Sequence, residues 1–249
     1  MVAVKYFKLL GAFLLAYWIL IIQFPRLSKL QKLQAIQSWS RQTLTVLGVR
    51  LDITPSVEHL SRTERPVLYV SNHVSWVDAL IIQAVQPSVF VAKDEVRAWP
   101  VVGAIASKCG VIYVKRSSIT STRQMVNEVV HALSNGFCVA GFPEGTTSIG
   151  SEVNPFYSNL FEASIFADAQ VLPIALRYTR AATGEPCTKT PFIGELSFIR
   201  SLHQVISSNG IVATVLTGQP ISPIGHTRKT LAQLSQHAVS TQLATLNNQ

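Results

Sequence analysis

The chain is poor in charged residues and in cysteine, and both shortages exclude classes of protein. Charged residues make up only 14% of the 249 residues, whereas hydrophobic residues make up 48%. The three cysteines, Cys109, Cys138 and Cys187, are odd in number and lack the spacing of metal ligands. They argue against a disulfide framework and favour a reducing compartment. Because no cluster of histidine and cysteine accompanies them, we expect no structural metal.

Acidic side chains are absent from residues 1–50. This segment carries seven basic residues and therefore +7 of the net charge of +8. A basic, apolar N-terminus favours an anionic membrane surface as partner. Nucleic-acid binding is not expected, because no recognisable element for reading bases accompanies the cations. The seven residues are Lys5, Lys8, Arg26, Lys29, Lys32, Arg41 and Arg50.

Two apolar patterns occupy this N-terminal segment. Residues 9–25 are an uncharged run of 17 residues, at the lower limit for crossing a bilayer, and no cleavage site of small residues follows them. An apolar stripe at near-helical spacing runs through residues 27–47. We expect one helix inserted in the membrane, by spanning it or dipping into one leaflet, and a second helix at the interface. Two core helices of a soluble domain are the alternative.

Strand and helix patterns alternate after Gly48. This alternation predicts an α/β domain at residues 51–249, with a largely parallel central sheet flanked by helices, preceded by the N-terminal two-helix membrane-associating segment at residues 1–50. In such a sheet, ligands bind beyond the carboxyl ends of the strands. We expect strands at 51–53, 67–71, 88–92, 111–114, 137–141, 171–178 and 210–217, and helices at 78–85, 120–134, 158–168 and 227–246.

A histidine and an aspartate stand at the end of the second expected strand. His73 follows the apolar run at 66–70, and Asp78 comes five residues later, where a helix is expected to begin. The imidazole can take a proton from a hydroxyl, and the carboxylate can hold the ring in the right tautomer and stabilise the imidazolium. Since no G-x-S-x-G nucleophile is present, we expect the activated hydroxyl to belong to the substrate. Alone, the pair also fits a turn histidine and a helix N-cap.

Two further strand ends carry polar residues. Lys115 and Arg116 follow one strand and offer a point charge and a planar fork for a phosphate. Glu144, Gly145 and Thr146 follow another, where the glycine lets the backbone approach a ligand closely and the threonine adds a hydroxyl. Each segment alone also fits an ordinary strand end or turn. Their occurrence together with the histidine and aspartate favours one functional site.

In this order and spacing, four blocks resemble the lysophospholipid and glycerol-phosphate acyltransferase family, specifically the 1-acyl-glycerol-3-phosphate acyltransferases. The blocks are residues 72–78, 111–116, 142–146 and 171–174, and the resemblance extends over about residues 60–220. It implies transfer of an acyl group from a thioester, carried by coenzyme A or acyl carrier protein, to the free hydroxyl of a lysophospholipid. The first choice of acceptor is 1-acyl-sn-glycerol-3-phosphate, which gives phosphatidate. No cofactor beyond the acyl donor is implied.

The resemblance also implies roles for individual residues. His73 would be the general base and Asp78 its orienting partner. An N-terminal anchor would hold the catalytic domain on the cytoplasmic face of the membrane, the inner membrane in a bacterium, so that the lysolipid and the acyl chain enter from the bilayer. The substrate-binding residues implied by the family pattern are Lys115, Arg116, Glu144, Gly145 and Thr146, with Arg116 contacting the acceptor's phosphate.

One position departs from the family pattern. The Glu-Gly-Thr block of lysophosphatidate acyltransferases usually continues with an arginine, whereas this chain has Thr147. Loss of a bidentate cation weakens the case for a phosphate monoester. The blocks at 144–148, 154–156 and 159–162 are similar to the subgroup that acylates other lysolipids, such as lyso-ornithine lipid, which is the alternative acceptor. A thioester hydrolase and a non-catalytic membrane lipid-binding protein remain as alternative functions.

Overall fold

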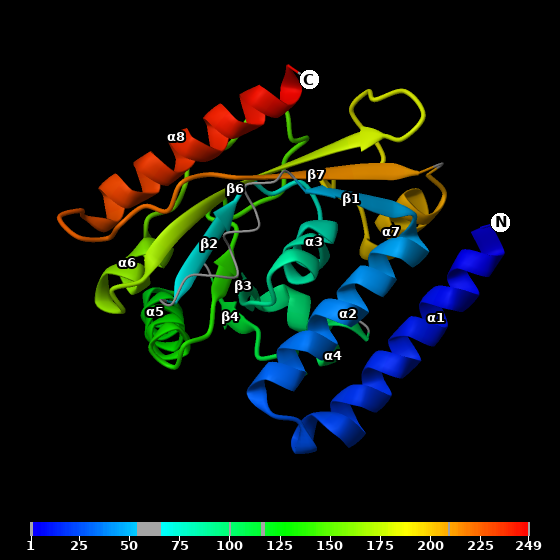
Figure 1. The fold of residues 1–249 in the computed structure, drawn as a ribbon, viewed down its shortest axis with the longest axis horizontal. Coiled ribbons are helices and arrows are strands. Elements are labelled where there is room, and N and C mark those ends of the chain that lie inside the picture. Colours follow the sequence, from blue (N-terminus) through cyan, green and yellow to red (C-terminus); the bar gives the residue numbers. More distant parts are fainter. Residues whose placement is uncertain (1, 54–65, 100, 116–117, 209, 249) are drawn as a thin grey trace.

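The computed structural model describes residues 2–53, 66–99, 101–115, 118–208 and 210–248. These residues form a seven-stranded sheet with helices packed on both of its faces (Figure 1). One large apolar core lies between the sheet and helices α2, α3 and α7, and a second lies between the sheet and α5, α6 and α8. The α/β class predicted from the alternation of patterns is confirmed.

The sheet is mixed but mostly parallel. Each pair of neighbouring strands is parallel except β6 and β7, which run antiparallel. Strands covered by helices on both faces are apolar on both faces, which explains the continuous hydrophobic runs that predicted them. Across the sheet the strands are β1 (Val49–Ile53), β7 (Ile211–Thr217), β6 (Gln170–Arg180), β2 (Val67–Ser71), β5 (Val139–Gly141), β3 (Val89–Lys93) and β4 (Ile112–Val114).

The expected strands and helices after Gly48 are all present, with ends within two residues of those predicted. The sequence patterns missed three short elements: η4 (Asp94–Ala98), α4 (Val102–Lys108) and α7 (Phe198–Ile206). The five residues of η4 and the seven of α4 display too little periodicity to be recognised, whereas the nine residues of α7 are as many as those of α3, so length does not explain why α7 was missed. The remaining helices of the domain are α3 (Val77–Val85), α5 (Ile119–Ser134), α6 (Asn159–Phe166) and α8 (Arg228–Asn247).

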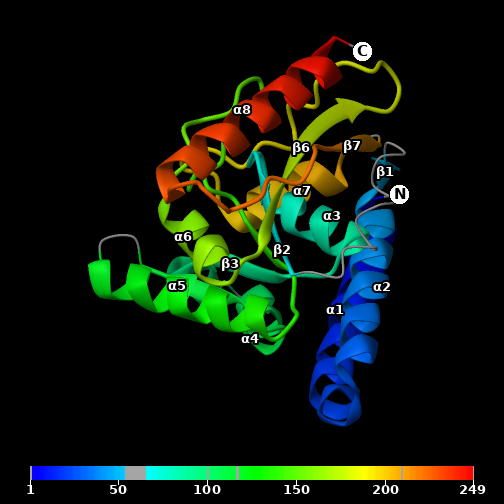
Figure 2. The same ribbon diagram turned by 60° about the vertical axis from the view of Figure 1, so that its left-hand side comes forward.

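The N-terminal segment is helical over almost its whole length. Helix α1 (Val2–Trp18) continues through η1 (Ile19–Gln23) and η2 (Phe24–Arg26), so the helical segment begins at Val2, seven residues before the uncharged run at 9–25. Helix α2 (Lys29–Leu47) begins at Ser28, whose side chain forms a reciprocal capping box with Gln31, and ends at Gly48 in the left-handed conformation. The two helices lie side by side in both ribbon views (Figures 1 and 2).

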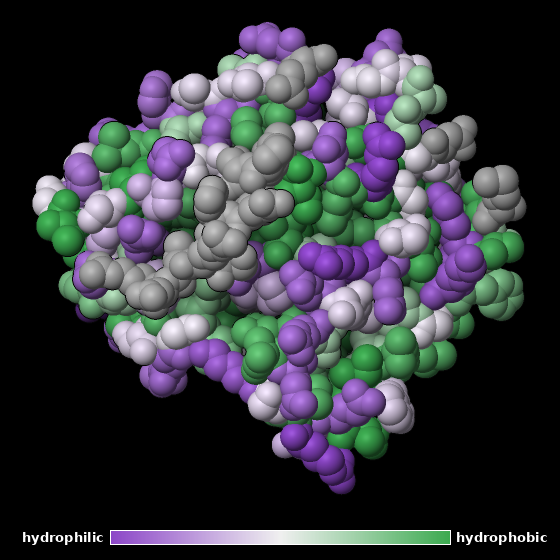
Figure 3. Space-filling model, in the orientation of Figure 1, coloured by the Kyte–Doolittle hydropathy of each residue, from purple (hydrophilic) through white to green (hydrophobic). Residues whose placement is uncertain are grey.

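The apolar helical segment Val2–Arg26 has one face against the protein and one face exposed. Among the described residues it is the one helix long and apolar enough to cross a membrane, and only 17% of its most apolar window is buried. Lys5 Nζ donates to the carbonyl oxygen of Ile206 at 3.0 Å, and Trp39 Nε1 donates to that of Ala12 at 2.9 Å. These contacts attach α1 to α7 and α2, while hydrophobic residues reach the surface along its outer side (Figure 3).

Candidate active site

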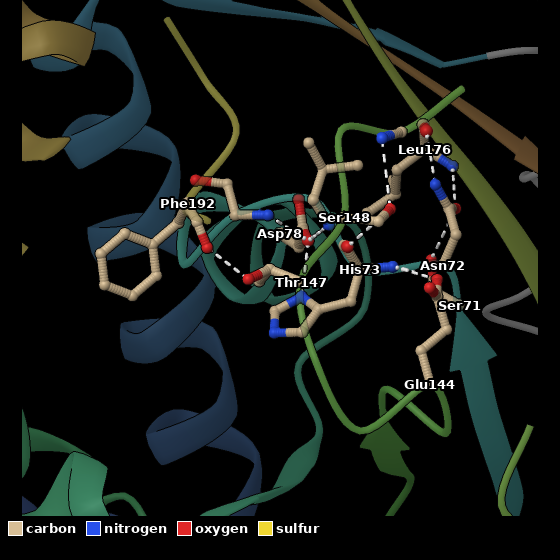
Figure 4. A network of polar contacts seen from close by, with 12 residues as sticks. Ser71, Asn72, His73, Asp78, Glu144, Thr147, Ser148, Leu176 and Phe192 are labelled. Carbon is tan, nitrogen blue, oxygen red and sulfur yellow. Dashed lines mark hydrogen bonds and ion pairs between the residues drawn. The ribbon is translucent and has the colours of Figure 1, made fainter. Parts of the chain in front are cut away.

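The candidate site begins where two neighbouring parallel strands end. Strands β2 and β5 are paired in register, with Val70 opposite Gly141. Their carboxyl ends therefore lie at the same edge of the sheet, and the segments that follow them meet there. His73 leaves β2 and Glu144 leaves β5 at this edge (Figure 4). Two of the three polar strand ends recognised in the sequence are thus brought together.

His73 and Asp78 form a hydrogen-bonded pair. Nδ1 of His73 lies 2.7 Å from Oδ2 of Asp78, and the histidine side chain is 21% exposed whereas the aspartate is fully buried. Asp78 stands in the first turn of α3, where the positive end of the helix dipole favours a carboxylate. With Nδ1 bound to the carboxylate, the proton-accepting nitrogen of the neutral imidazole is Nε2, which faces away from Asp78 (Figure 4).

The carboxylate of Asp78 is held by more than the histidine. Its Oδ2 also accepts hydrogen bonds from the backbone N–H groups of Val74 and Ser75, at 2.7 and 2.9 Å. Its Oδ1 accepts a hydrogen bond from the phenol of Tyr178, which sequence reasoning did not select. Phe142 stacks on the His73 ring with centroids 4.0 Å apart and an interplanar angle of 4°. The plane of the imidazole is therefore set on one edge by a carboxylate and on one face by an aromatic ring.

Glu144 is buried beneath the histidine. Its Oε1 accepts a hydrogen bond from the backbone N–H of His73 at 2.7 Å, and its Oε2 accepts one from the N–H of Asn154 at 3.2 Å. Burial raises the pKa of Glu144 above its ordinary value, although the two hydrogen bonds offset part of the shift. Both carboxyl oxygens thus support the backbone on either side of the site.

The loop after Glu144 is joined to the histidine segment. The N–H of Ser148 donates to the carbonyl of His73 at 2.8 Å, and the hydroxyl of Thr147 donates to the carbonyl of Phe192. The N–H of Phe192 in turn donates to the carbonyl of Val74 at 2.9 Å. Thr147 therefore serves to connect loops, at the position where the family pattern has an arginine.

Asn72 fixes the histidine segment to strand β6. Its side-chain Nδ2 donates to the carbonyl of Leu176 at 2.9 Å, and its Oδ1 accepts from the N–H of the same residue at 2.8 Å. A single amide side chain thus reproduces the pair of bonds that a neighbouring strand would make. Asn72 was recognised only as part of a sequence block, because its partner lies 104 residues away.

Lys115 lies away from the histidine and aspartate. It follows β4 at the edge of the sheet, three strand positions from β2, which corresponds to roughly 14 Å. Its side chain is 69% exposed, and its Nζ lies 3.8 Å from Oδ2 of Asp94. Arg116 lies outside the described residues. The proposed contact of this pair with an acceptor phosphate therefore stays a prediction from the sequence.

A large apolar cavity opens beside His73. Its volume is about 870 Å³, and its wall includes Gly145 and Thr146 but not Glu144. The assignment of these three residues to substrate binding stays a prediction. Helices α1 and α2, strand β3 and helix α4 supply much of the remainder of the wall. Its apolar residues include Leu9, Phe13, Ala16, Leu20, Trp39, Leu47, Leu80, Val91, Trp99, Ile105, Met125 and Leu160. The site therefore places a candidate base at the side of a space suited to a hydrocarbon chain.

The cysteine in this cavity does not have the properties of a nucleophile. Cys109 contributes to the cavity wall, and burial raises the pKa of its thiol to about 12. A thiol of this pKa is almost wholly protonated near neutral pH, whereas the thiolate is the nucleophilic form. Among the described parts of the chain, no group of three or more histidine, cysteine, aspartate or glutamate residues could hold a metal ion.

Comparison with known proteins places this site in a family. Residues 52–177 match the family model described as "Acyltransferase". Over 176 residues the chain is 34% identical to the lyso-ornithine lipid O-acyltransferase of Pseudomonas aeruginosa, covering 70% of this chain and 67% of the relative. Over 183 residues it is 37% identical to the 1-acyl-sn-glycerol-3-phosphate acyltransferase of Neisseria meningitidis serogroup B, covering 73% of this chain and 69% of the relative.

A solved structure has the same fold. The crystal structure of the 1-acyl-sn-glycerophosphate acyltransferase from Thermotoga maritima superimposes with a TM-score of 0.68 at 19% identity, and the match covers 98% of each chain. The sequence matches, together with this shared fold, confirm the resemblance that the four blocks predicted. The chain belongs to the acyltransferase family.

Proposed function

We propose that this acyltransferase moves a fatty acyl group from a thioester to the free hydroxyl of a lysophospholipid, with 1-acyl-sn-glycerol-3-phosphate as the first acceptor and phosphatidate as its product. The observation that carries the proposal is the geometry of His73: its Nδ1 is bound to buried Asp78, and its ring lies at the wall of a large apolar cavity. The names of the relatives, a 1-acyl-sn-glycerol-3-phosphate acyltransferase and a lyso-ornithine lipid O-acyltransferase, support this class of acceptor.

The chemistry follows from the two nitrogen atoms of His73. Nε2 accepts the proton of the acceptor hydroxyl while that oxygen attacks the carbonyl carbon of the thioester. Asp78 stabilises the resulting imidazolium through Nδ1. As the tetrahedral intermediate collapses, the carbon–sulfur bond breaks, and the leaving thiolate takes the proton back from Nε2. The products are the acylated lipid and a free thiol, and base catalysis of this kind contributes a factor of about 10² to 10⁴.

The cavity supports an acyl-chain substrate. Its wall is made largely of aliphatic and aromatic side chains from the N-terminal helices and from the sheet domain. Burial of a hydrocarbon chain against such a wall contributes about 0.8 kcal/mol per methylene. An apolar wall also disfavours water beside a bound thioester, which would favour transfer to the lipid hydroxyl over hydrolysis. We propose coenzyme A or acyl carrier protein as the carrier of the thioester.

Lyso-ornithine lipid is the second candidate acceptor. The observation that favours it is the contact of Thr147, whose hydroxyl donates to the carbonyl of Phe192. This side chain joins two loops and supplies no cation, whereas a phosphate monoester is recognised best by a bidentate guanidinium. The relative from Pseudomonas aeruginosa, which is named for lyso-ornithine lipid, matches this chain over nearly the same extent as the relative named for the phosphate acceptor.

The N-terminal helices are proposed to hold the enzyme on the cytoplasmic face of a membrane. The exposed side of the 25-residue apolar segment supplies a hydrophobic surface, and the surrounding basic residues favour anionic headgroups. Since α1 and α2 also line the cavity, a lysolipid and an acyl chain could pass from the bilayer into the site without crossing water.

A competition assay tests the acceptor. Membranes containing the protein receive one acyl thioester together with lysophosphatidate, lyso-ornithine lipid and a neutral lysolipid, and the products are identified by mass spectrometry. We expect phosphatidate to dominate and to disappear in His73→Ala. Acylated ornithine lipid as the main product would keep the reaction and change the acceptor. Free fatty acid alone, or transfer that persists fully in a folded His73→Ala protein, would contradict the proposal.

A further inference from the structure

A buried tyrosine contacts the catalytic pair from the far side of the carboxylate. Tyr178 lies near the end of β6, 5% exposed, and is 100 residues from Asp78 in sequence. Its phenol donates a hydrogen bond to Oδ1 of Asp78, the oxygen that does not contact the histidine. The structure thus links three side chains in series, from tyrosine to aspartate to histidine.

The second oxygen of the carboxylate is already fully engaged. Oδ2 of Asp78 accepts from Nδ1 of His73 and from the N–H groups of Val74 and Ser75. A carboxylate bound only through one oxygen can still turn about its bond to the side chain, which moves the other oxygen through an arc. A donor on Oδ1 that comes from a different element removes this freedom.

We propose that Tyr178 is a positioning residue of the acyl-transfer reaction, which fixes the plane of the Asp78 carboxylate and moderates the negative charge that this carboxylate presents to His73. The inference rests on the proposed function of His73 as the base. Tyr178 acts through Asp78 and does not touch the substrate in this assignment.

The surroundings of Tyr178 suit this task. The phenol is enclosed in the apolar core between the sheet and helices α2, α3 and α7. Burial and the neighbouring Asp78 therefore raise the pKa of Tyr178 well above the ordinary value. The group therefore stays protonated and donates to the carboxylate at every pH at which the enzyme works. Cys187 donates its N–H to the carbonyl of Tyr178 at 3.0 Å, which fixes the backbone on this side.

The same strand is also locked to the histidine segment. Asn72, which directly precedes His73, makes two hydrogen bonds to the backbone of Leu176, two residues before Tyr178 on β6. Two connections therefore fix the position of the phenol relative to the imidazole. One runs from Asn72 to the backbone of β6, and the other runs through the carboxylate of Asp78. Such rigid support of a functional group by its neighbours is what precise proton transfer requires.

The test compares two tyrosine-to-phenylalanine variants in the same sheet. Tyr178→Phe removes the donor to Asp78. Tyr69→Phe is the matched control, because Tyr69 is also buried, lies on the adjacent strand β2, and has its hydroxyl near Sγ of Cys138, at 3.9 Å, rather than at the site. For Tyr178→Phe we expect kcat to fall about tenfold or more with little change in either KM, since a hydrogen bond to a charged group is lost. For Tyr69→Phe we expect kcat within about twofold of the wild type, because its hydroxyl does not contact the site.

The pH profile separates positioning from a merely structural role. Without the phenol, Asp78 presents more negative charge to His73, so the imidazolium is held more tightly and the acidic limb of kcat/KM moves to higher pH. Glu144, which faces His73 from the β5 side, and the two backbone donors to Asp78 are unchanged in this variant. A general loosening of the fold would instead lower the rate equally at every pH.

A second variant covers the case in which Tyr178→Phe does not fold. Incorporation of 3-fluorotyrosine at position 178 keeps the size of the ring and makes the phenol a stronger donor, so the acidic limb is expected to move to lower pH. An unshifted limb in every folded variant, or equal losses for Tyr178→Phe and Tyr69→Phe, would overturn the inference. These results would leave the proposed function intact as long as His73→Ala remains inactive.

Discussion

At the scale of single residues, the site depends on how completely His73 is held. Its backbone N–H is bound by Glu144, its carbonyl by Ser148, its ring nitrogen by Asp78, and its ring face by Phe142. The pairing of His73 with Asp78 could be predicted, because the two residues are only five positions apart, on either side of the short connection between a strand and a helix. The contacts of Glu144 and Tyr178 could not, because they depend on which strands lie next to β2.

Glu144 gives a prediction about stability and pH. Burial raises its pKa above the ordinary value of 4.5, so the folded protein keeps the proton to a higher pH than the unfolded chain. Its contribution to stability is therefore complete below pH 4.5 and is lost as the pH rises through the folded-state pKa. Glu144→Gln removes this titration. We expect the free energy of unfolding of the wild type, relative to the variant, to fall as the pH rises from 4.5.

Thermal unfolding in detergent micelles at stepped pH values measures this difference. Glu152→Gln is the control, because Glu152 is an exposed carboxylate near the same loop. We expect its unfolding curve to follow that of the wild type at each pH. A constant difference between the wild type and Glu144→Gln over the whole range would show that the buried carboxyl does not titrate as described.

Arg116 gives a prediction about the acceptor. If this residue binds the acceptor phosphate, Arg116→Ala should raise the KM for lysophosphatidate about tenfold or more and leave the KM for the acyl thioester nearly unchanged, since a charge-assisted bidentate contact is lost on one substrate only. Arg200→Ala is the matched control, because Arg200 is an exposed arginine of α7 that does not line the cavity. Steady-state kinetics with each substrate varied in turn would refute the assignment if both KM values rose equally.

At the scale of helices and strands, the sequence predicted the elements better than their order. The pattern of continuous apolar runs identified the strands, because both faces of the sheet are covered by helices. It could not show that β5 and β6 flank β2, which is what places Glu144 and Tyr178 at the histidine. Nor did it show that β6 runs antiparallel to β7, since an antiparallel pair and a parallel pair of buried strands have the same apolar pattern.

The short elements η4 and α4 give a prediction about packing. Gly103, in the first turn of α4, is buried, and a Cβ atom there would lie 2.1 Å from the backbone carbonyl oxygen of Arg97 in η4. Since backbone atoms cannot give way as a flexible side chain can, Gly103→Ala should destabilise the protein by about 1–3 kcal/mol. It should also lower activity, because Trp99, Val102 and Ile105 of this region line the cavity.

Gly11→Ala is the matched control for this substitution. Gly11 is also helical, in α1, but a Cβ atom there meets no other atom within 4 Å. Replacing a helical glycine by alanine in open space stabilises a helix by up to about 1 kcal/mol. Thermal unfolding and acyl-transfer rates of both variants provide the comparison. A Gly103→Ala protein as stable as Gly11→Ala would contradict the packing seen around η4.

At the scale of the whole molecule, the N-terminal helices and the sheet domain share one cavity. Leu9, Phe13 and Ala16 of α1 lie in its wall together with residues of β3, α4 and α5. The composition of residues 1–50 predicted a membrane surface as partner, but it did not indicate that the inner side of α1 would line the site. That arrangement depends on contacts between α1 and the distant helix α7, such as the one from Lys5 to Ile206.

The outer side of α1 gives a prediction about membrane binding. Phe7, Leu14 and Trp18 are exposed on it, at 77%, 63% and 51%. Replacing all three by serine should weaken binding to vesicles by tenfold or more, because each buried apolar side chain contributes about 1–3 kcal/mol at a membrane. Binding of the wild type should strengthen with anionic lipid, because each basic residue near the surface contributes about 1 kcal/mol. Added salt should weaken this electrostatic contribution.

Vesicle flotation measures this binding. Ile119→Ser is the control, because Ile119 is 76% exposed on α5, outside the N-terminal helices. We expect this variant to bind like the wild type. Equal binding of the triple variant and the wild type would show that the membrane is contacted through another surface.

The most direct measurement is the release of free thiol from an acyl thioester, followed with and without a lysolipid acceptor, in the wild type and in His73→Gln. If His73 activates the hydroxyl of the acceptor for direct attack, thiol release by the wild type requires the acceptor and matches acylated lipid in amount. In His73→Gln it falls by about 10² to 10⁴. Rapid thiol release without acceptor, or a rate in His73→Gln equal to that of the wild type, would contradict direct attack by a hydroxyl that His73 activates.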